Sequence, residues 1–196
     1  LEFTYRFAND VERAWLADNT RKVSEVADFR SMAVVRRDAG DERGLTQVKA
    51  VDDAYPLVGD VVLSPDVTLP EALDGTDVPG AVMDRLLIDR LGLTIGDRFD
   101  LGMQTFTLMA ELVTEPDTTG GFGLGPRTIV LRNDLAGSDL LEPGTLYSSK
   151  YRMMFAPDVD LGALQSQVDA DFAQSGARWQ DARVTVRVHE LPEEEG

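Results

Sequence analysis

Helical and strand-like spacings of apolar residues follow one another in the middle of the chain, over residues 81–115. The pattern predicts a short strand, a helix that ends at Gly92, and then two further strands. The apolar positions of the helix are Leu86, Leu87 and Leu91, and the two later strands are Arg98–Leu101 and Thr105–Val113. Gly92 suits a helix end because a residue without Cβ adopts the left-handed conformation at little cost. The segment predicts a strand-rich unit without an evident catalytic group.

The start of the chain has the pattern of a strand, a capped helix and a second strand. Phe3–Phe7 alternates like a half-buried strand, and Asn9 or Asp10 can cap a helix that continues through Asp18. This helix is expected to place Val11, Ala14 and Trp15 on one side. The run Val23–Arg36 then predicts one long strand.

The end of the chain repeats this layout. Lys150–Phe155 predicts a strand, and Asp158 or Asp160 can cap the helix that follows. Its apolar stripe, at steps of three, four and four, is Leu161, Leu164, Val168 and Phe172. Gly176 is expected to end this helix, and Arg178–Val188 predicts a return strand.

The two similar ends predict an α+β sandwich, with both helices on the same face of the sheet. About a hundred residues separate them, which is too long for a loop, so the middle must be folded. Its other expected strands are Leu45–Val51, Val61–Ser64 and Arg127–Leu131. We therefore expect residues 1–52 with 147–190 to form one α+β subdomain. Residues 53–146 form a β-rich insertion, and residues 191–196 form an acidic tail.

Composition narrows the possible functions. The chain has 35 acidic and 19 basic residues, a formal net charge of −16, which makes nucleic acid and anionic lipid surfaces poor partners. It has no cysteine, which excludes thiol catalysis and thiolate metal sites. The single histidine, His189, is expected on the surface, and a His-based triad or a zinc site built on several histidines is disfavoured.

The best glycine-rich segment is the loop of residues 118–126, TTGGFGLGP. A phosphate-binding loop needs glycines that lead into a helix N-terminus, whereas the run after Pro126 is β-branched and predicts a strand. Nucleotide binding is therefore disfavoured, and no cofactor is predicted. The loop is interpreted either as a plain hairpin or as a tip that contacts a partner or substrate, through Gly121, Phe122, Gly123 and Leu124.

Carboxylate pairs are the remaining candidates for chemistry. They are Asp52 with Asp53, Asp84 with Asp89, Asp158 with Asp160, and Asp169 with Asp171. A glycosidase pair needs two carboxylates held in a cleft, and a calcium loop needs a pattern that none of these pairs has. Solvated acids and helix caps explain them better, although a hydrolase that uses Asp84 and Asp89 stays open as a minor alternative.

Four segments together resemble a known family. They are ADFRSMAVV at 27–35, TQVKAVDDAYPLVGDVVLSP at 46–65, RLGLTIGD at 90–97 and GGFGLGPRTIVLRNDL at 120–135. In this order and spacing they resemble the first periplasmic domain of MacB/FtsX-type ABC transporter permeases of the YbbP branch. The resemblance covers roughly residues 3–182. Residues 184–196 depart from it, and are interpreted either as a last strand or as a join where a membrane part was deleted.

The resemblance implies a Porter-like subdomain made by both chain ends, with an inserted Sabre-like subdomain. It also implies transmembrane helices on both sides of the chain, at the periplasmic face of the cytoplasmic membrane. Such permeases pair with a second subunit or copy and are driven by a cytoplasmic ATPase. The implied function is non-enzymatic: coupling of ATP hydrolysis to handling or export of a lipidic or hydrophobic substrate or a partner protein. The alternative is a binding module that recruits a periplasmic enzyme such as an esterase.

Overall fold

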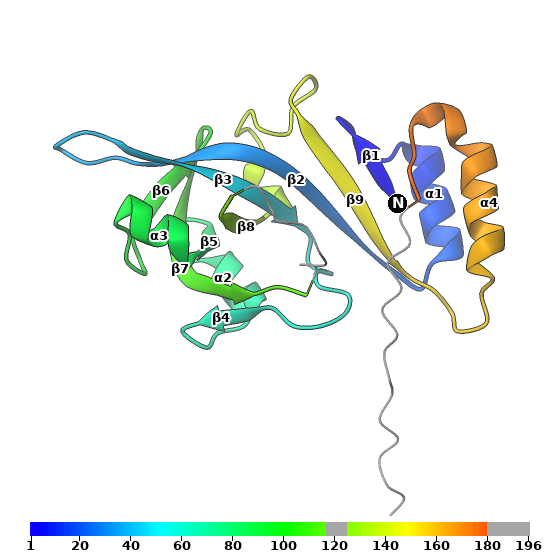
Figure 1. The fold of residues 1–196 in the computed structure, drawn as a ribbon, viewed down its shortest axis with the longest axis horizontal. Helices are drawn as coiled ribbons and strands as arrows, with labels where there is room; N and C mark the ends of the chain where they lie inside the picture. Colours follow the sequence, from blue (N-terminus) through cyan, green and yellow to red (C-terminus); the bar gives the residue numbers. More distant parts are fainter. Residues whose placement is uncertain (117–124, 180–196) are drawn as a thin grey trace, which may run out of the picture.

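One mixed sheet runs through the whole described molecule (Figure 1). The computed structural model describes residues 1–116 and 125–179, and within these ranges the sheet has nine strands. They are β1 (Glu2–Thr4), β2 (Lys22–Val35), β3 (Glu42–Val51), β4 (Val62–Ser64), β5 (Gly80–Asp84), β6 (Arg98–Leu101), β7 (Gln104–Thr114), β8 (Arg127–Leu131) and β9 (Tyr147–Met154). Their order is β1-β9-β2-β3-β8-β5-β7-β4, and β6 pairs with β2 and β7.

Helices cover both faces of this sheet. The α-helices are α1 (Asp10–Asn19), α2 (Leu69–Asp74), α3 (Arg85–Leu91) and α4 (Leu161–Asp171), and two short 3₁₀ turns are η1 (Arg132–Leu135) and η2 (Ala173–Ser175). No helix within the described ranges is both long and apolar enough to cross a membrane. The mixed, strand-rich α+β class predicted from the sequence is confirmed.

Strand β2 belongs to both parts of the molecule. Its first half, Lys22–Phe29, pairs with β9, and its second half, Ala27–Val35, pairs with β3. The last residues of β2 also pair with β6. Figure 1 shows β2 extending from the helices α1 and α4 to the tip of the β2–β3 hairpin at the opposite end. One unbroken strand therefore connects the helix-covered end with the strand-rich end.

Helices α1 and α4 lie side by side over β1 and β9 (Figure 1) and share a core with them. The Trp15 ring meets the Phe172 ring edge to face, with centroids 6.1 Å apart. Val168 of the predicted α4 stripe is buried, and Asp160 caps α4 by accepting hydrogen bonds from two backbone N–H groups. The predicted placement of both helices on one face is therefore confirmed.

Two details at the start of the chain differ from the sequence prediction. Strand β1 ends at Thr4 rather than Phe7, because Tyr5 has a positive φ of 61° that turns the chain out of the strand. Helix α1 buries Glu12, Trp15 and Leu16, whereas Val11 is 69% exposed. The helix turns this way because the Glu12 carboxylate has partners inside: Arg6 at 2.7 Å and the N–H of its cap, Asn9, at 2.8 Å.

The strand-rich end has a core on each face of the sheet. Neighbouring residues of β5 enter different cores, with Met83 beside α3 and Val82 beside α2. Helix α3 ends as predicted at Gly92, which has a left-handed φ of 58°. Its buried face is Leu87, Ile88 and Leu91, while Leu86 is 73% exposed, so one of the three predicted apolar positions faces solvent.

A chain of charged side chains crosses the sheet where the two parts join. Asp28 of β2 accepts from Lys150 of β9 at 2.8 Å and from Arg127 of β8 at 3.2 Å. Arg127 also contacts Glu115 at 2.9 Å, and Glu115 contacts Lys49 of β3 at 2.5 Å. We call these five residues the charge ladder. Because most of its members are buried or half-buried, removal of one partner leaves a poorly hydrated charge behind.

We predict that the buried Glu12 makes stability dependent on pH. Burial raises the pKa of Glu12, but hydrogen bonds from Arg6 and from the Asn9 backbone outweigh it, so its pKa lies below the ordinary 4.5. The lowered folded-state pKa stabilises the fold above about pH 4.5, and this contribution is lost as the pH falls through that folded-state pKa. Glu12→Gln should cost about 1–3 kcal/mol at pH 7 and less at pH 3. Urea unfolding at pH 7 and at pH 3, monitored by tryptophan fluorescence, measures the free energy of unfolding of both proteins.

The matched control is Asp18→Asn, at an exposed position on the same helix. It should leave both unfolding curves unchanged. An equal effect of the two substitutions at the two pH values would contradict the role given to Glu12.

A second prediction concerns the charge ladder. Asp28→Ala leaves Lys150 without its partner and removes one partner of Arg127, so it should lower the free energy of unfolding by about 2–3 kcal/mol. Asp38→Ala, at an exposed residue near the tip of the β2–β3 hairpin, should have little effect in the same urea titration. If Asp28→Ala also had little effect, the ladder would contribute nothing to stability.

Candidate functional site

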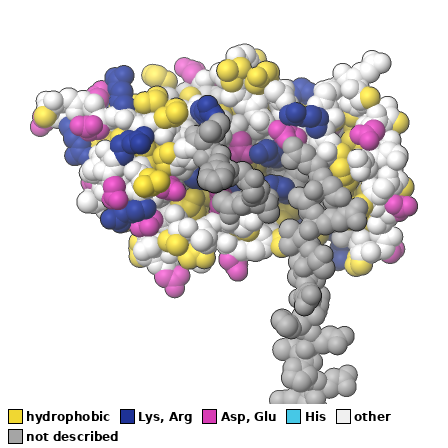
Figure 2. Space-filling view, in the orientation of Figure 1, with side chains coloured by type: hydrophobic (Ala, Val, Ile, Leu, Met, Phe, Trp, Pro, Cys, Tyr) yellow, Lys and Arg dark blue, Asp and Glu magenta, His cyan; other side chains and the backbone are white. Residues whose placement is uncertain are grey.

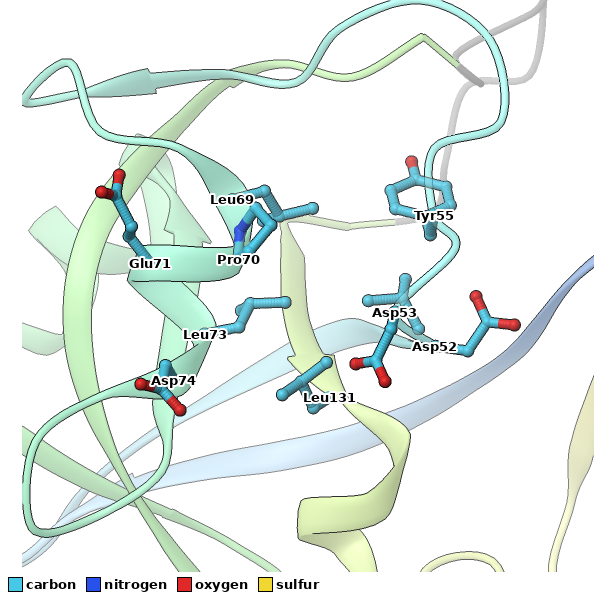
Figure 3. Close-up of a pocket in the computed structure, with 10 residues that line it drawn as sticks. Asp52, Asp53, Tyr55, Leu69, Pro70, Glu71, Leu73, Asp74 and Leu131 are labelled. Atoms are coloured by element: carbon cyan, nitrogen blue, oxygen red, sulfur yellow. The ribbon is translucent and has the colours of Figure 1, made fainter.

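A hollow lies at the carboxyl ends of two parallel strands. Strands β3 and β8 run parallel, and their last residues, Val51 and Leu131, lie opposite each other in the register. Helix α2 faces these strand ends, and a pocket of about 370 Å³ lies between them (Figure 3). The carboxyl ends of parallel strands are a common place for ligand sites in α/β sheets, because the chain leaves the sheet there.

The floor of this pocket is apolar. Figure 3 shows Leu69 and Leu73 projecting from α2 towards the end of β3. Leu69, Leu73 and Val51 are buried members of the core on this face, as is Tyr55, and the half-buried Leu131 packs against it. A volume of about 370 Å³ with such a lining lies within the range of small-molecule sites in proteins.

The rim of the pocket is acidic. The charged residues that line it are Asp52, Asp53, Glu71 and Asp74. Asp52 has a structural role, since it accepts from the Ser24 hydroxyl at 2.7 Å and from the Glu25 N–H at 2.6 Å. Glu71 forms a capping box with Thr68 at the start of α2. Two of the four carboxylates therefore hold the walls of the pocket in place.

The other two rim acids, Asp53 and Asp74, are exposed, and in the view of Figure 3 they lie on either side of Leu131. Neither carboxylate forms a hydrogen bond or an ion pair within the part of the chain that the structure describes. A further acid, Asp134, is close enough to Asp74 to sense its charge: burial is the main cause that raises the pKa of Asp134, and the charge of Asp74 adds to it. The described lining of the pocket therefore holds four acids and neither Lys nor Arg. In the same ranges, no three His, Asp or Glu side chains are grouped as metal ligands.

Glycine holds helix α2 against the sheet. A Cβ atom on Gly80 of β5 would lie 1.9 Å from the carbonyl oxygen of Ala72, in the middle of α2. The backbone of the helix thus touches the backbone of the strand, which only glycine allows. This close approach fixes the distance of Leu69 and Leu73 from the sheet, and with it the width of the pocket.

The structure separates the roles of the Asp84 and Asp89 pair. Asp84 caps α3 by accepting from the Leu86 N–H at 2.8 Å, and Asp89 pairs with Arg85 at 2.9 Å. Asp89 does line a second hollow of about 430 Å³, but it shares that hollow with Arg85 and Glu111. The pair therefore serves helix α3, and the two carboxylates do not converge on one cavity.

The remaining sequence candidates fall outside the site. Gly121, Phe122, Gly123 and Leu124 lie outside the described residues, as do His189 and most of the predicted Arg178–Val188 strand. Asp160 is a helix cap, and Asp158, Asp169 and Asp171 are exposed. Sequence reasoning noted Asp52 and Asp53 but interpreted them as solvated acids. It missed their neighbour Asp74, because only the tertiary contact between α2 and β3 brings these acids together.

Known proteins resemble this chain in sequence and in fold. No protein-family model matches the chain. Over 151 residues the chain is 30% identical to the ABC transporter permease YbbP of Escherichia coli K12, in a match that covers 75% of this chain and 18% of that permease. The chain thus spans less than a fifth of its relative's length.

Two solved structures share the fold. The extracellular domain of the ABC-type transporter YknZ from Gram-positive bacteria matches with a TM-score of 0.53 and 16% identity, covering 90% of this chain and 86% of that domain. A domain of a permease protein from Porphyromonas gingivalis matches with a TM-score of 0.51 and 12% identity, covering 80% and 70%. The predicted resemblance to an extracytoplasmic domain of an ABC transporter permease is confirmed. The predicted location, at the periplasmic face of the cytoplasmic membrane, is supported by the same relatives.

We predict that Gly80→Ala damages the pocket and the fold together. The added methyl group must push α2 away from β5, which should cost about 2–3 kcal/mol in thermal or urea unfolding. Gly162→Ala is the control, since its Cβ would meet only a side-chain oxygen at 3.3 Å in the first turn of α4. Equal stability of the two variants would show that α2 does not depend on the contact at Gly80.

Proposed function

We propose that this chain is the extracytoplasmic domain through which an ABC transporter permease couples cytoplasmic ATP hydrolysis to the handling of a lipidic or hydrophobic substrate or of a partner protein. The observation that carries the proposal is the 30% identity to a permease over 151 residues. The fold shared with an extracellular transporter domain supports it. The domain acts by moving and binding, with no chemistry of its own, and needs a second permease subunit or copy and an ATPase.

The architecture suits a mechanical role. In the proposed division, residues 1–52 with 147–190 form a Porter-like base, and residues 53–146 form a Sabre-like lobe inserted into it. Strands β2 and β3 of the base pair with β6 and β8 of the lobe, and the charge ladder also joins the two, so a displacement of the base is transmitted to the lobe without a flexible linker. The sheet acts as a lever because its backbone hydrogen bonds are continuous.

The direct test uses the intact permease with its ATPase, reconstituted in proteoliposomes. Replacing residues 1–179 by a short Gly-Ser linker should leave ATP hydrolysis measurable but lower substrate release at least about tenfold, because the coupling free energy between the two sites is lost. Unchanged release after this replacement would contradict the proposal.

A second experiment addresses the glycine-rich loop. Phe122→Ser with Leu124→Ser, in the intact transporter, should reduce release or partner binding if this loop is the contact tip. Val11→Ser with Leu86→Ser is the matched control, because these apolar side chains are also exposed, at 69% and 73%. Equal activity of the two double variants would remove the loop from the site.

A binding experiment distinguishes the alternative, recruiting role from the coupling role. If the domain mainly recruits a periplasmic enzyme such as an esterase, the immobilised chain should retain that purified enzyme, and the transporter without the domain should still release substrate. A domain that only transmits motion retains nothing.

A further inference from the structure

The pocket between α2 and the ends of β3 and β8 combines two features that select one kind of ligand. Its floor is hydrophobic: the half-buried Leu131 and the exposed Pro70 present apolar surface beside the buried Leu69, Leu73 and Val51. Its lining contains four acids and no basic residue. An apolar surface gains free energy when it is covered, by about 25 cal/mol per Å² of area removed from water. An acidic rim favours a positive charge next to that apolar group and disfavours a negative one.

We propose that this pocket binds an amphiphilic cation, a small organic molecule with an apolar body and an ammonium group. The apolar body lies against Leu131 and Pro70, and the ammonium group lies between Asp53 and Asp74. The inference rests on the proposed function, because it names the class of hydrophobic substrate that the transporter domain would handle.

The geometry of the rim supports an organic cation that spans the pocket. Asp52 and Glu71 already accept hydrogen bonds from the protein, so Asp53 and Asp74 are the carboxylates with acceptor capacity to spare. They stand on two sides of the apolar floor in Figure 3, one after β3 and one at the end of α2. Asp134 adds to the negative field, and its mutual repulsion with Asp74 would be relieved by a bound cation.

The absence of basic residues from the pocket lining distinguishes it from other parts of the acidic surface. Figure 2 shows Lys and Arg side chains over the β2–β3 hairpin and over the centre of the visible face, where acids and bases are mixed. The lining of the other hollow likewise pairs Asp89 and Glu111 with Arg85. The pocket between α2 and the ends of β3 and β8 differs, because its lining contains no basic residue that could pair with its acids.

The test compares three probes with the same apolar chain on the 196-residue protein. Octylammonium, octyl sulfate and octanol are titrated by isothermal calorimetry below their aggregation concentrations. We expect octylammonium to bind at least about tenfold more tightly than the other two, and its affinity to fall with added salt. Equal affinity for octylammonium and octyl sulfate would overturn the proposal, because the rim would then confer no selection.

Variants separate the pocket from the general negative charge. Asp53→Asn with Asp74→Asn should weaken octylammonium binding about five- to twentyfold. The control is Asp60→Asn with Asp66→Asn, at two exposed acids on the neighbouring loops. This double variant removes the same charge and should change the affinity for octylammonium less than twofold. Equal losses in both double variants would show that octylammonium follows net charge alone, and would also overturn the proposal.

Two further measurements check that the variants fold and that octylammonium binds at this pocket. Circular dichroism confirms that the double variants fold, and amide chemical shifts of Leu69–Asp74 should move on titration with octylammonium but not with octyl sulfate. If octylammonium binds here but the transporter does not need this domain, the proposed function fails and the site stands. If coupling requires the domain but no cation binds, the site fails and the proposed function stands.

Discussion

Strand β2 is the constraint on which the rest of the structure depends. Between Ala27 and Phe29 it pairs with β9 on one side and β3 on the other, so the two ends of the chain and its middle share one hydrogen-bonded sheet. Asp28 lies at this crossing and contacts both Lys150 and Arg127. If one part tilted against the other, backbone hydrogen bonds of the sheet would break or the ion pairs of the charge ladder would separate. Either change is costly, because it leaves buried polar or charged groups without partners.

The same sheet also creates the pocket. Because successive residues of a strand point to opposite faces, one face of the strand-rich end receives α3 and the other receives α2. Because β3 and β8 are parallel, both strands end at the same edge of the sheet. Acidic residues come directly after these ends: Asp52 and Asp53 after β3, and Asp134 after β8. Gly80 brings α2 close enough to close this edge with an apolar wall. The proposed lever and the proposed ligand site therefore share one set of strands.

Local patterns in the sequence predicted much of this fold. The Val23–Arg36 run, the end of α3 at Gly92 and the capping aspartate of α4 follow from side-chain periodicity and backbone preference, which depend on near neighbours. The inward position of Glu12 was missed although it has a local signal, the capping box that Glu12 forms with Asn9 three residues earlier. The parallel pairing of β3 with β8 was not predictable, because it depends on partners far along the chain. The pocket was missed for this reason: Asp53 and Asp74 lie 21 positions apart, and no local motif connects them.

We expect the helix-covered end and the strand-rich end to behave as one mechanical body through β2. Native-state hydrogen exchange of the β2 amides tests this most directly, because it measures the opening free energy of each half of the strand. Residues 23–26 pair with β9 and residues 31–34 pair with β3, and the amides of both groups should open with the same free energy, in one cooperative unit. Two opening free energies that differ by several kcal/mol would contradict it, and would show two bodies joined by a hinge within β2.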